Sequence, residues 1–352
     1  MAKIDWERVR KGAKRDNNTI VWKAYGFPAI ADLDCTCFHD APISEPWSDM
    51  PEKLIVSVAI TGSFVRRDKN PNQPYSPDEI RASAREVLLA GASTVHIHVR
   101  DENGYFTLDP KRFRQVIEPL KEEFPDLAVD GCLVCGLPHD WQQFEKTIDT
   151  GLLDASPVNP TATYIGDSLL AKPVPILLQK TRMLLERGIT PEIAVYTDGD
   201  VANADRYLIR SGLIGPGAVW LVLPALPGCS PMNNTRQMGY GLLRMAGLIQ
   251  DVDPEAVIIV CAAGRASSAL AMLAVSLGFH IRIGMEDTYY MHPHKNDIIE
   301  SNLQTFEMAK SLATASGREV ATRAEYKAMI DARRSTETLA ATGADIDTVA
   351  AE

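Results

Sequence analysis

Short runs of β-branched and apolar residues alternate along the chain with longer amphipathic runs, beginning at residue 53. The short runs have the composition of strands, whereas the long runs repeat their apolar positions with the period of a helix. The predicted strands are residues 54–60, 94–101, 127–132, 152–156, 193–197, 218–223, 256–261 and 279–283. The helices that follow them begin near Ser76, where Pro77 and Glu79 complete a capped start, and then cover residues 110–123, 138–150, 168–187, 201–211, 235–250, 266–277 and 296–314.

Eight strands, each followed by a helix, predict a protein of the α/β class that folds as a (β/α)8 TIM barrel. A doubly wound open sheet is the alternative, but the glycine-rich fingerprint of such sheets does not follow the first strand. Three regions are expected: an N-terminal extension over residues 1–50 that packs on the barrel, the catalytic barrel over residues 51–325, and a C-terminal helical tail over residues 326–352.

Composition narrows the functional classes. The chain has 352 residues, 45% hydrophobic content and a net charge of −10, which argues against general binding to nucleic acid or anionic membranes. It has no apolar run long enough to span a membrane and no apolar segment near its start, so we expect a cytoplasmic protein. The six cysteines do not form paired knuckles; Cys132 and Cys135 are either a redox pair or thiols at a strand end or lining a pocket.

Two histidines and two acids at opposite ends of the chain are the strongest candidates for a site. His96 and His98 lie on one face of the second strand, because side chains alternate along a strand. Glu286 and Asp287 follow the eighth strand, which is a neighbour of the first two strands where a barrel closes. Two imidazoles and one carboxylate form a common catalytic zinc set. Taken alone, the acid pair is also compatible with a solvated loop or a helix N-cap.

The same residues suggest chemistry. Asp287, next to a metal ligand, could act as a general base, and Arg282 could orient it or bind a substrate carboxylate. Thr61, Cys132 and Ser156 are expected at the same barrel mouth, at the ends of their strands. Arg66, with Arg67 and Lys69, could meet a carboxylate or a CoA phosphate, or form a solvated loop. His292 and His294 lie in a loop that contains proline, where a substrate-binding or exposed role is preferred to metal binding.

Several of these segments resemble the β-keto acid cleavage enzymes. The similarity rests on residues 59–62, 96–101 and 284–287, and continues at residues 191–193, 263–265, 301–302 and 317–322. It implies a zinc-dependent barrel, or one that uses another divalent transition metal, assembled as a homo-oligomer such as a tetramer. The reaction it implies converts a β-keto acid and acetyl-CoA into acetoacetate and a new acyl-CoA.

The resemblance also implies roles. His96, His98 and Glu286 correspond to metal ligands, Asp287 to the base, and Arg282 to its helper. The alternatives are a metal-dependent aldolase or hydrolase that does not use CoA, and a metal-binding protein without catalysis.

The chain departs from the family pattern at four positions. Members that cleave an amino-substituted acid carry a Glu where this chain has Phe64, so we expect a substrate side chain that is not cationic. Cys132 and Ser156 stand near positions of a catalytic Ser and Thr, and Ala194 where a second acid is frequent.

Overall fold

The computed structural model describes residues 3–14, 46–47, 50–134, 140–224, 234–261 and 263–334. The chain divides into two compact units, Met1–Met50 and Pro51–Glu352. The first unit contains helix α1, Trp6–Ala13, whose polar and apolar residues separate onto different faces. The expectation that this extension packs on the barrel stays a prediction, and most of the expected C-terminal tail lies outside the described residues.

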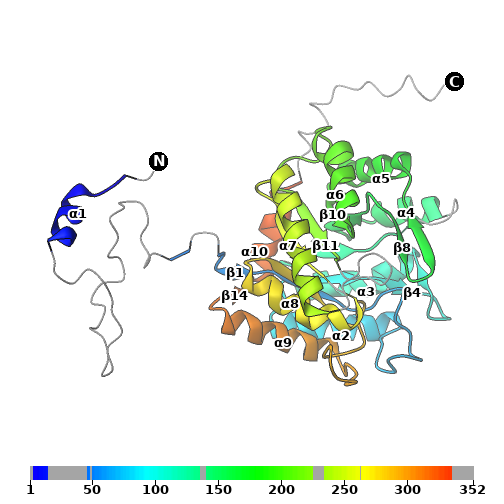
Figure 1. Cartoon of the computed structure of the whole chain (residues 1–352). Coiled ribbons are helices and arrows are strands. Elements are labelled where there is room, and N and C mark those ends of the chain that lie inside the picture. The colour runs from blue at the N-terminus through cyan, green and yellow to red at the C-terminus, as the bar shows by residue number, and fades with distance from the viewer. Residues whose placement is uncertain are drawn as a thin grey trace, which may run out of the picture. The chain divides into compact units, whose positions relative to one another are not determined.

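Eight parallel strands form a closed barrel, so the predicted TIM barrel is confirmed (Figure 1). Strand β13 pairs with β2 and closes the ring, with Arg282 beside Ser57 in the register. The first predicted strand therefore lies between the eighth and the second, so all three meet where the barrel closes. The barrel strands are β2 Val56–Ala59, β3 Thr94–Ile97, β6 Val129–Gly131, β7 Ala155–Val158, β10 Thr190–Val195, β11 Val219–Val222, β12 Val257–Val260 and β13 His280–Ile283.

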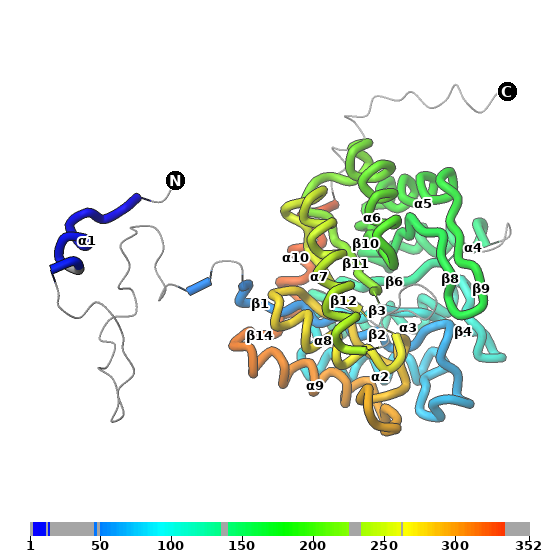
Figure 2. Tube along the Cα trace, viewed as in Figure 1, coloured from blue at the N-terminus to red at the C-terminus, as the bar shows by residue number. Residues whose placement is uncertain are grey.

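A helix follows each barrel strand, and Figure 2 shows these helices around the central strands. They are α2 Pro77–Ala90, α3 Pro110–Glu123, α4 Asp140–Ile148, α5 Val174–Glu186, α6 Asp198–Ala204, α7 Thr235–Val252, α8 Ser267–Ser276 and α9 Asn302–Ala315. Helix α6 continues into a π-helical turn, η1, Asp205–Ile209, and a 3-10 turn, η2, Gly264–Ala266, precedes α8. No helix in the described part of the chain combines the length and apolar character needed to cross a bilayer.

Local sequence signals explain most helix starts. Ser76 accepts a hydrogen bond from the amide of Glu79, and the Glu79 carboxylate accepts one from the amide of Ser76, which confirms the predicted capping box. The last barrel helix begins at Asn302, six residues later than predicted. Ser301 caps it by accepting a hydrogen bond from the amide of Gln304, and the preceding residues form a loop.

The start of the predicted helix 168–187 is wrong. Residues 168–171 are not helical: β9, Ser168–Ala171, forms an antiparallel hairpin with β8, Ala162–Ile165. Gly166 turns the hairpin in the left-handed region, with φ of +58°. Helix α5 then starts after Pro173. Proline is tolerated there because its nitrogen carries no hydrogen, and the first nitrogens of a helix have no hydrogen-bond partner within the helix.

Apolar side chains fill two layers, one between strands and helices and one inside the barrel. Val56 and Val58 of β2 face the outer layer, whereas Ala155, Ala194 and Leu221 belong to the inner one. Because successive side chains of a strand point to opposite faces, these residues show which positions of each strand face the interior.

The segment after α9 closes the barrel at the amino ends of its strands. Strand β14, Glu319–Val320, pairs with β1, Lys53–Leu54, and helix α10, Arg323–Asp331, follows. The buried guanidinium of Arg318 donates to the carbonyl oxygens of Phe279 and Lys53, each at 2.8 Å. From α10, Tyr326 and Ile330 reach into the inner layer, 1% and 0% exposed. A second hairpin, β4 Val99–Arg100 with β5 Phe106–Thr107, lies beyond β3.

His280, at the start of β13, gives the fold a pH dependence. Its Nδ1 accepts a hydrogen bond from the amide of Ile55 at 3.0 Å, and burial, with a contribution from Arg318, lowers its pKa to about 3. Between pH 6.5 and about 3, His280 is protonated in the unfolded chain but neutral in the folded chain. The free energy of unfolding therefore falls as the pH falls through this range, by up to about 1.4 kcal/mol per pH unit.

We expect His280→Asn to remove this pH dependence of the stability, because its amide oxygen can replace Nδ1 as the acceptor but does not titrate. Urea unfolding at a series of pH values from 7.5 to 4 measures it, with wild type as the reference. Parallel stability curves for the two proteins would contradict the assignment.

Candidate metal centre and active site

The two histidines of β3 point into the barrel and are almost fully buried. His96 is 0% exposed and His98, one residue past the strand, is 3% exposed. Their neighbours Val95, Ile97 and Val99 face the helices instead. The ring centroids of the histidines are 5.2 Å apart. The alternation read from the sequence therefore places both imidazoles on the interior face.

Glu286 lies between these imidazoles. Its Oε2 is 3.3 Å from His96 Nε2, and its Oε1 is 3.2 Å from His98 Nε2. The structure thus brings together the three side chains that the sequence predicts to converge, although 188 residues separate His98 from Glu286. Burial opposes ionisation of Glu286, but the neighbouring His96, His98 and Arg282 hold the pKa of its carboxyl group well below its usual range.

Two glycines make room for this approach. Gly284 has φ of +139°, and a Cβ there would lie 2.2 Å from the carbonyl oxygen of Ala59. A Cβ at Gly62 would lie 2.2 Å from Cγ of Glu286. The amide of Glu286 donates to the same Ala59 carbonyl at 3.2 Å. The end of β13 therefore crosses directly against the end of β2, and only glycine permits that distance.

The polar atoms of this group fit a divalent cation. His96 Nε2 and Glu286 Oε2 are buried and have no hydrogen-bond partner. His96 Nε2 instead points at an acidic oxygen, which is the arrangement of ligand atoms around an ion. Two imidazole nitrogens with a carboxylate oxygen suit zinc and several other transition metals.

Cys132, expected as a catalytic residue near this mouth, offers a further donor atom. One ligand atom each from His96, His98 and Cys132 lie within 4.8 Å of one another. Burial opposes ionisation of the thiol, but the neighbouring imidazoles, above all the charge of His98, lower its pKa to about 6. Cys135, which the sequence pairs with it, lies outside the described residues.

Arg282 and Asp287 adjoin the same group. Arg282 Nη2 donates to Asp287 Oδ1 at 2.6 Å and to Glu286 Oε1 at 3.1 Å. The other oxygen of Asp287, Oδ2, is buried without a partner. Burial raises the pKa of the Asp287 carboxyl group, and Arg282 opposes this rise. One oxygen of Asp287 is thus held by a guanidinium while the other remains available to a substrate.

Asp130 was missed in the sequence. It lies on β6, 3% exposed, and its Oδ2 contacts Nδ1 of His96. A carboxylate on the rear nitrogen of a histidine fixes the ring and leaves Nε2 for a metal. The available signal was an acid inside the apolar run 127–132, at the same strand parity as Cys132.

Four other predicted residues lie apart from this group. Thr61 is buried, and its hydroxyl accepts a hydrogen bond from Arg100 Nε at 3.0 Å. Phe64 is 68% exposed, and Arg66 lies in the same exposed loop, over the ring of Tyr105. Ser156 is buried on the face of β7 that carries Val158, which packs against the helices. A catalytic role for Ser156 has no support in this geometry, because its side chain faces away from the interior.

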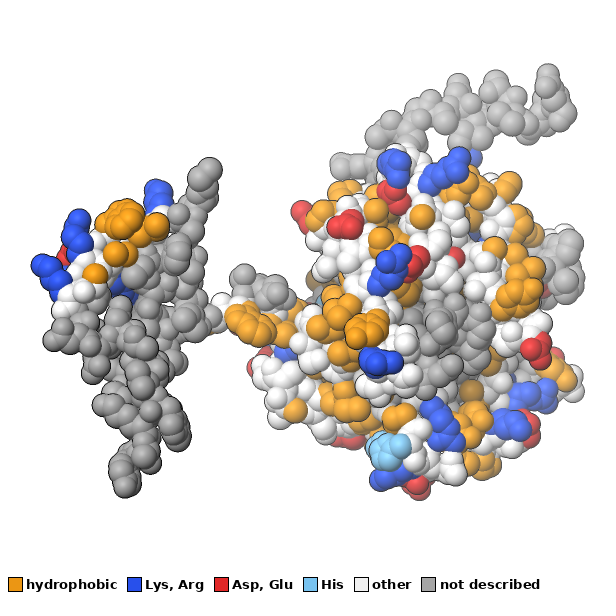
Figure 3. All heavy atoms as spheres, viewed as in Figure 1, with side chains coloured by type: hydrophobic (Ala, Val, Ile, Leu, Met, Phe, Trp, Pro, Cys, Tyr) orange, Lys and Arg blue, Asp and Glu red, His pale blue; other side chains and the backbone are white. Residues whose placement is uncertain are grey.

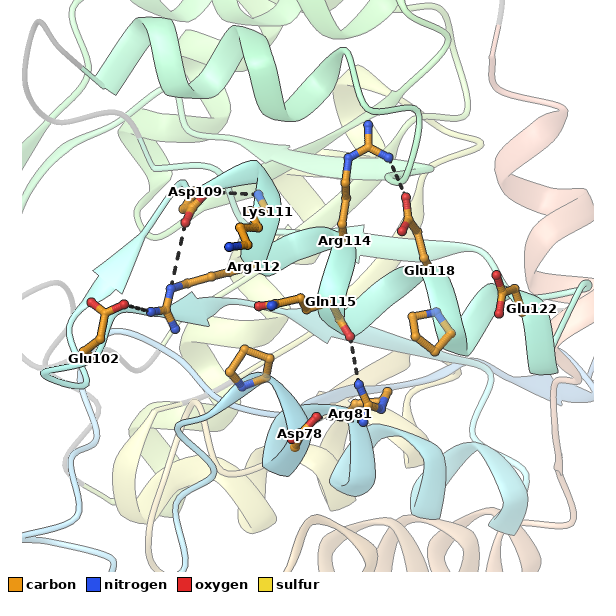
Figure 4. Close-up of a pocket in the computed structure, with 12 residues that line it drawn as sticks. Asp78, Arg81, Glu102, Asp109, Lys111, Arg112, Arg114, Gln115, Glu118 and Glu122 are labelled. Atoms are coloured by element: carbon orange, nitrogen blue, oxygen red, sulfur yellow. Dashed lines mark hydrogen bonds and ion pairs between the residues drawn. The ribbon is translucent and has the colours of Figure 1, made fainter.

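The outer surface offers no rival cluster where it is described. A cleft between α2 and α3 is lined by ten charged or amide side chains (Figure 4). Its arginines are paired there: Arg81 with Asp78, Arg112 with Glu102, and Arg114 with Glu118. On the face drawn in Figure 3, charges of both signs are interspersed with apolar side chains over the barrel unit. The barrel mouth remains the candidate site.

The chain is similar along most of its length to known proteins. The family profile described as beta-keto acid cleavage enzyme matches residues 53–331. A 3-keto-5-aminohexanoate cleavage enzyme of Fusobacterium nucleatum is 29% identical over 81% of this chain and 100% of its own length. A 3-oxoadipate:acetyl-CoA acetyltransferase of Cupriavidus necator is 24% identical over 80% of this chain and 95% of its own length.

Among solved structures, the apo structure of ObcA matches with a TM-score of 0.64 and 16% identity, over 74% of this chain and 65% of that one. At this identity the likeness supports the fold alone. Because the family profile covers the whole barrel, including β3, the end of β13 and the closing helix α10, the chain belongs to the beta-keto acid cleavage enzyme family.

Proposed function

We propose that this protein transfers an acyl group from a β-keto acid to CoA, using acetyl-CoA and releasing acetoacetate. The observation that carries the proposal is the convergence of His96, His98 and Glu286 beside the Arg282–Asp287 pair. The names of the relatives support acetyl-CoA as the second substrate, since one of them is an acetyl-CoA acetyltransferase that the chain matches along 95% of its length.

We assign the metal ligands as His96, His98 and Glu286. One oxygen of Glu286 lies 3.3 Å from Nε2 of His96 and the other 3.2 Å from Nε2 of His98, so the carboxylate faces both imidazole nitrogens. Cys132 is then a catalytic thiol beside the ligands, as its sequence position suggests. When bound, a divalent ion such as zinc would supply Lewis acidity at the ketone of the keto acid.

The chain's own residues account for the proton transfers. Asp287 Oδ2 takes a proton from C2 of the keto acid, while Arg282 holds Oδ1 in place. The carbanion at C2 forms a bond to the acetyl carbonyl carbon, and CoA thiolate leaves. The thiolate adds to the C3 ketone, the C2–C3 bond breaks, and Asp287 returns its proton to C2. The products are acetoacetate and the new acyl-CoA, so atoms and charges balance.

The substrate side chain is uncharged or anionic in this proposal. The resemblance noted in the sequence matches Phe64 to an acid of members that cleave an amino-substituted acid, and Arg66 follows it without an acidic partner among the described residues. An ammonium group would find no acid at position 64, and the one acid of the segment 64–69, Asp68, already lies 3.9 Å from Lys69, so its desolvation would be poorly compensated.

A panel of β-keto acids tests this function. With acetyl-CoA, a neutral and a dicarboxylic keto acid should give acetoacetate with kcat/KM at least about tenfold above that of an amino-substituted one. Phe64→Glu should narrow that ratio, because it adds the missing counter-charge. Acetoacetate from none of the acids would sink the proposal, and consumption of an acid without acetyl-CoA would favour an aldolase or hydrolase.

The variant Asp287→Asn tests whether Asp287 acts as the general base and not as a metal ligand. We expect bound zinc to stay stoichiometric while kcat falls about 10²–10⁴-fold, because the variant keeps the shape of the side chain but cannot take a proton. Metal analysis and initial rates measure the two effects, and His96→Ala, which should lose the metal, is the reference. Unchanged turnover in Asp287→Asn would remove this residue from the mechanism.

Gly62→Ala tests the position of Glu286 without altering any donor atom. The added methyl group occupies the path of the Glu286 side chain, so we expect zinc affinity to fall about 10–100-fold. Gly247→Ala on α7 is the matched control, since its Cβ would meet nothing within 4 Å. Equal zinc affinity in the two variants would show that Glu286 is not held as a ligand.

A further inference from the structure

Three buried polar groups lie behind His96, on the side away from Glu286. They are Asp130 of β6, Glu192 of β10 and Tyr326 of α10, which are 3%, 3% and 1% exposed. Each lies at the barrel interior, close to the apolar side chains of the inner layer. Buried acids are costly unless they are paired, so the contacts among these groups require an explanation.

The three groups form a continuous series of contacts. Asp130 Oδ2 meets Nδ1 of His96, and its other oxygen, Oδ1, is buried without a hydrogen-bond partner. Glu192 lies close enough to Asp130 for that residue to raise its pKa. The hydroxyl of Tyr326 donates to Glu192 Oε1 at 3.4 Å, a long hydrogen bond. The series therefore runs from the helix that closes the barrel floor, through strands β10 and β6, to β3.

The environment of each group in this series favours a role as hydrogen-bond donor or acceptor. No Lys or Arg in the described ranges forms an ion pair with either acid. Burial, and then the charge of Asp130, raise the pKa of Glu192 well above its usual range, which favours the protonated form that can donate to the unpartnered Oδ1 of Asp130. Burial and Glu192 raise the pKa of Tyr326, whose hydroxyl also stays a donor. Asp130 is then the common acceptor for Glu192 and for the N–H of His96.

We propose that Tyr326, Glu192 and Asp130 are positioning residues that fix the Nδ1 edge of His96 and thereby set the affinity of the mouth for its divalent ion. The proposal rests on the proposed function only in taking His96 Nε2 as a ligand atom. It makes the floor helix α10 part of the metal centre, although it lies at the opposite end of the barrel.

The second histidine provides an internal contrast. Nδ1 of His98 is buried and has no hydrogen-bond partner, whereas Nδ1 of His96 has Asp130. Of the two imidazoles, only that of His96 thus has a partner at its Nδ1. Loss of such support generally reduces metal affinity 10–100-fold, so the effect of the series should be measurable at His96 alone.

Zinc affinity, measured by competition with a fluorescent chelator, tests the proposal without any turnover. Asp130→Asn and Glu192→Leu should bind zinc about 10–100-fold more weakly than wild type. Glu192→Gln should stay within about threefold, because its amide can donate to Asp130 and accept from Tyr326 as the protonated acid does. Tyr326→Phe should lose about fivefold, the value of one hydrogen bond.

Thermal unfolding with and without zinc provides the second readout. The shift in Tm caused by zinc should shrink in Asp130→Asn and Glu192→Leu but not in Glu192→Gln. Tyr207→Phe, outside the series, is the control for Tyr326→Phe and should bind zinc as wild type does. Where Glu192→Leu folds poorly, Asp130→Asn and Tyr326→Phe keep the test valid, because both nearly preserve the size of the original side chain.

Two outcomes would overturn the proposal: zinc affinity of Asp130→Asn within twofold of wild type, or equal affinities of Glu192→Gln and Glu192→Leu. The proposed function fails separately. Wild-type protein that binds zinc but makes no acetoacetate from any keto acid would refute the function and leave the positioning series intact.

Discussion

The pairing of β13 with β2 is the contact on which the site depends. It closes the barrel, and it brings residues near position 60 against residues near position 285. At the carboxyl ends of these two strands Gly284 lacks room for a Cβ because the backbone of Ala59 is so close, and Gly62 lacks room because the Glu286 side chain lies against it. Asn302 reinforces the junction, donating to the carbonyl of Ile60 and accepting from the amide of Met285. Glu286 reaches the histidines because this junction is tight.

The barrel was predictable because short apolar runs, which indicate strands, alternate regularly with amphipathic runs, which indicate helices. The convergence of His96, His98 and Glu286 was predictable for the same reason, since parallel strands in a barrel present their carboxyl ends at one mouth. Where both faces of a strand are apolar or small, the sequence carries less information. Residues 152–158 contain no clear alternation, so nothing in that run indicates that Ser156 faces the helices and Ala155 the interior.

Other differences arise from contacts across the barrel. Asp130 and Glu192 lie on strands separated by β7, and no local pattern relates them to each other or to Tyr326 far along the chain. Their association depends on the width of the closed barrel, which the sequence does not state. The sequence predicts a helix over β9 because leucines and an alanine at residues 169–171 favour a helix locally, whereas Gly166 turns the chain into a hairpin and α5 starts only after Pro173.

The alternation along β3 limits how this strand can evolve. Thr94, His96 and His98 face inward, while Val95 and Ile97 pack against the helices. Insertion or deletion of one residue before His96 would exchange the two sets, sending both imidazoles into the apolar layer and placing valine and isoleucine at the mouth. Variation in chain length should therefore accumulate in the hairpins β4–β5 and β8–β9, while β3 itself diverges only by replacement of one side chain with another.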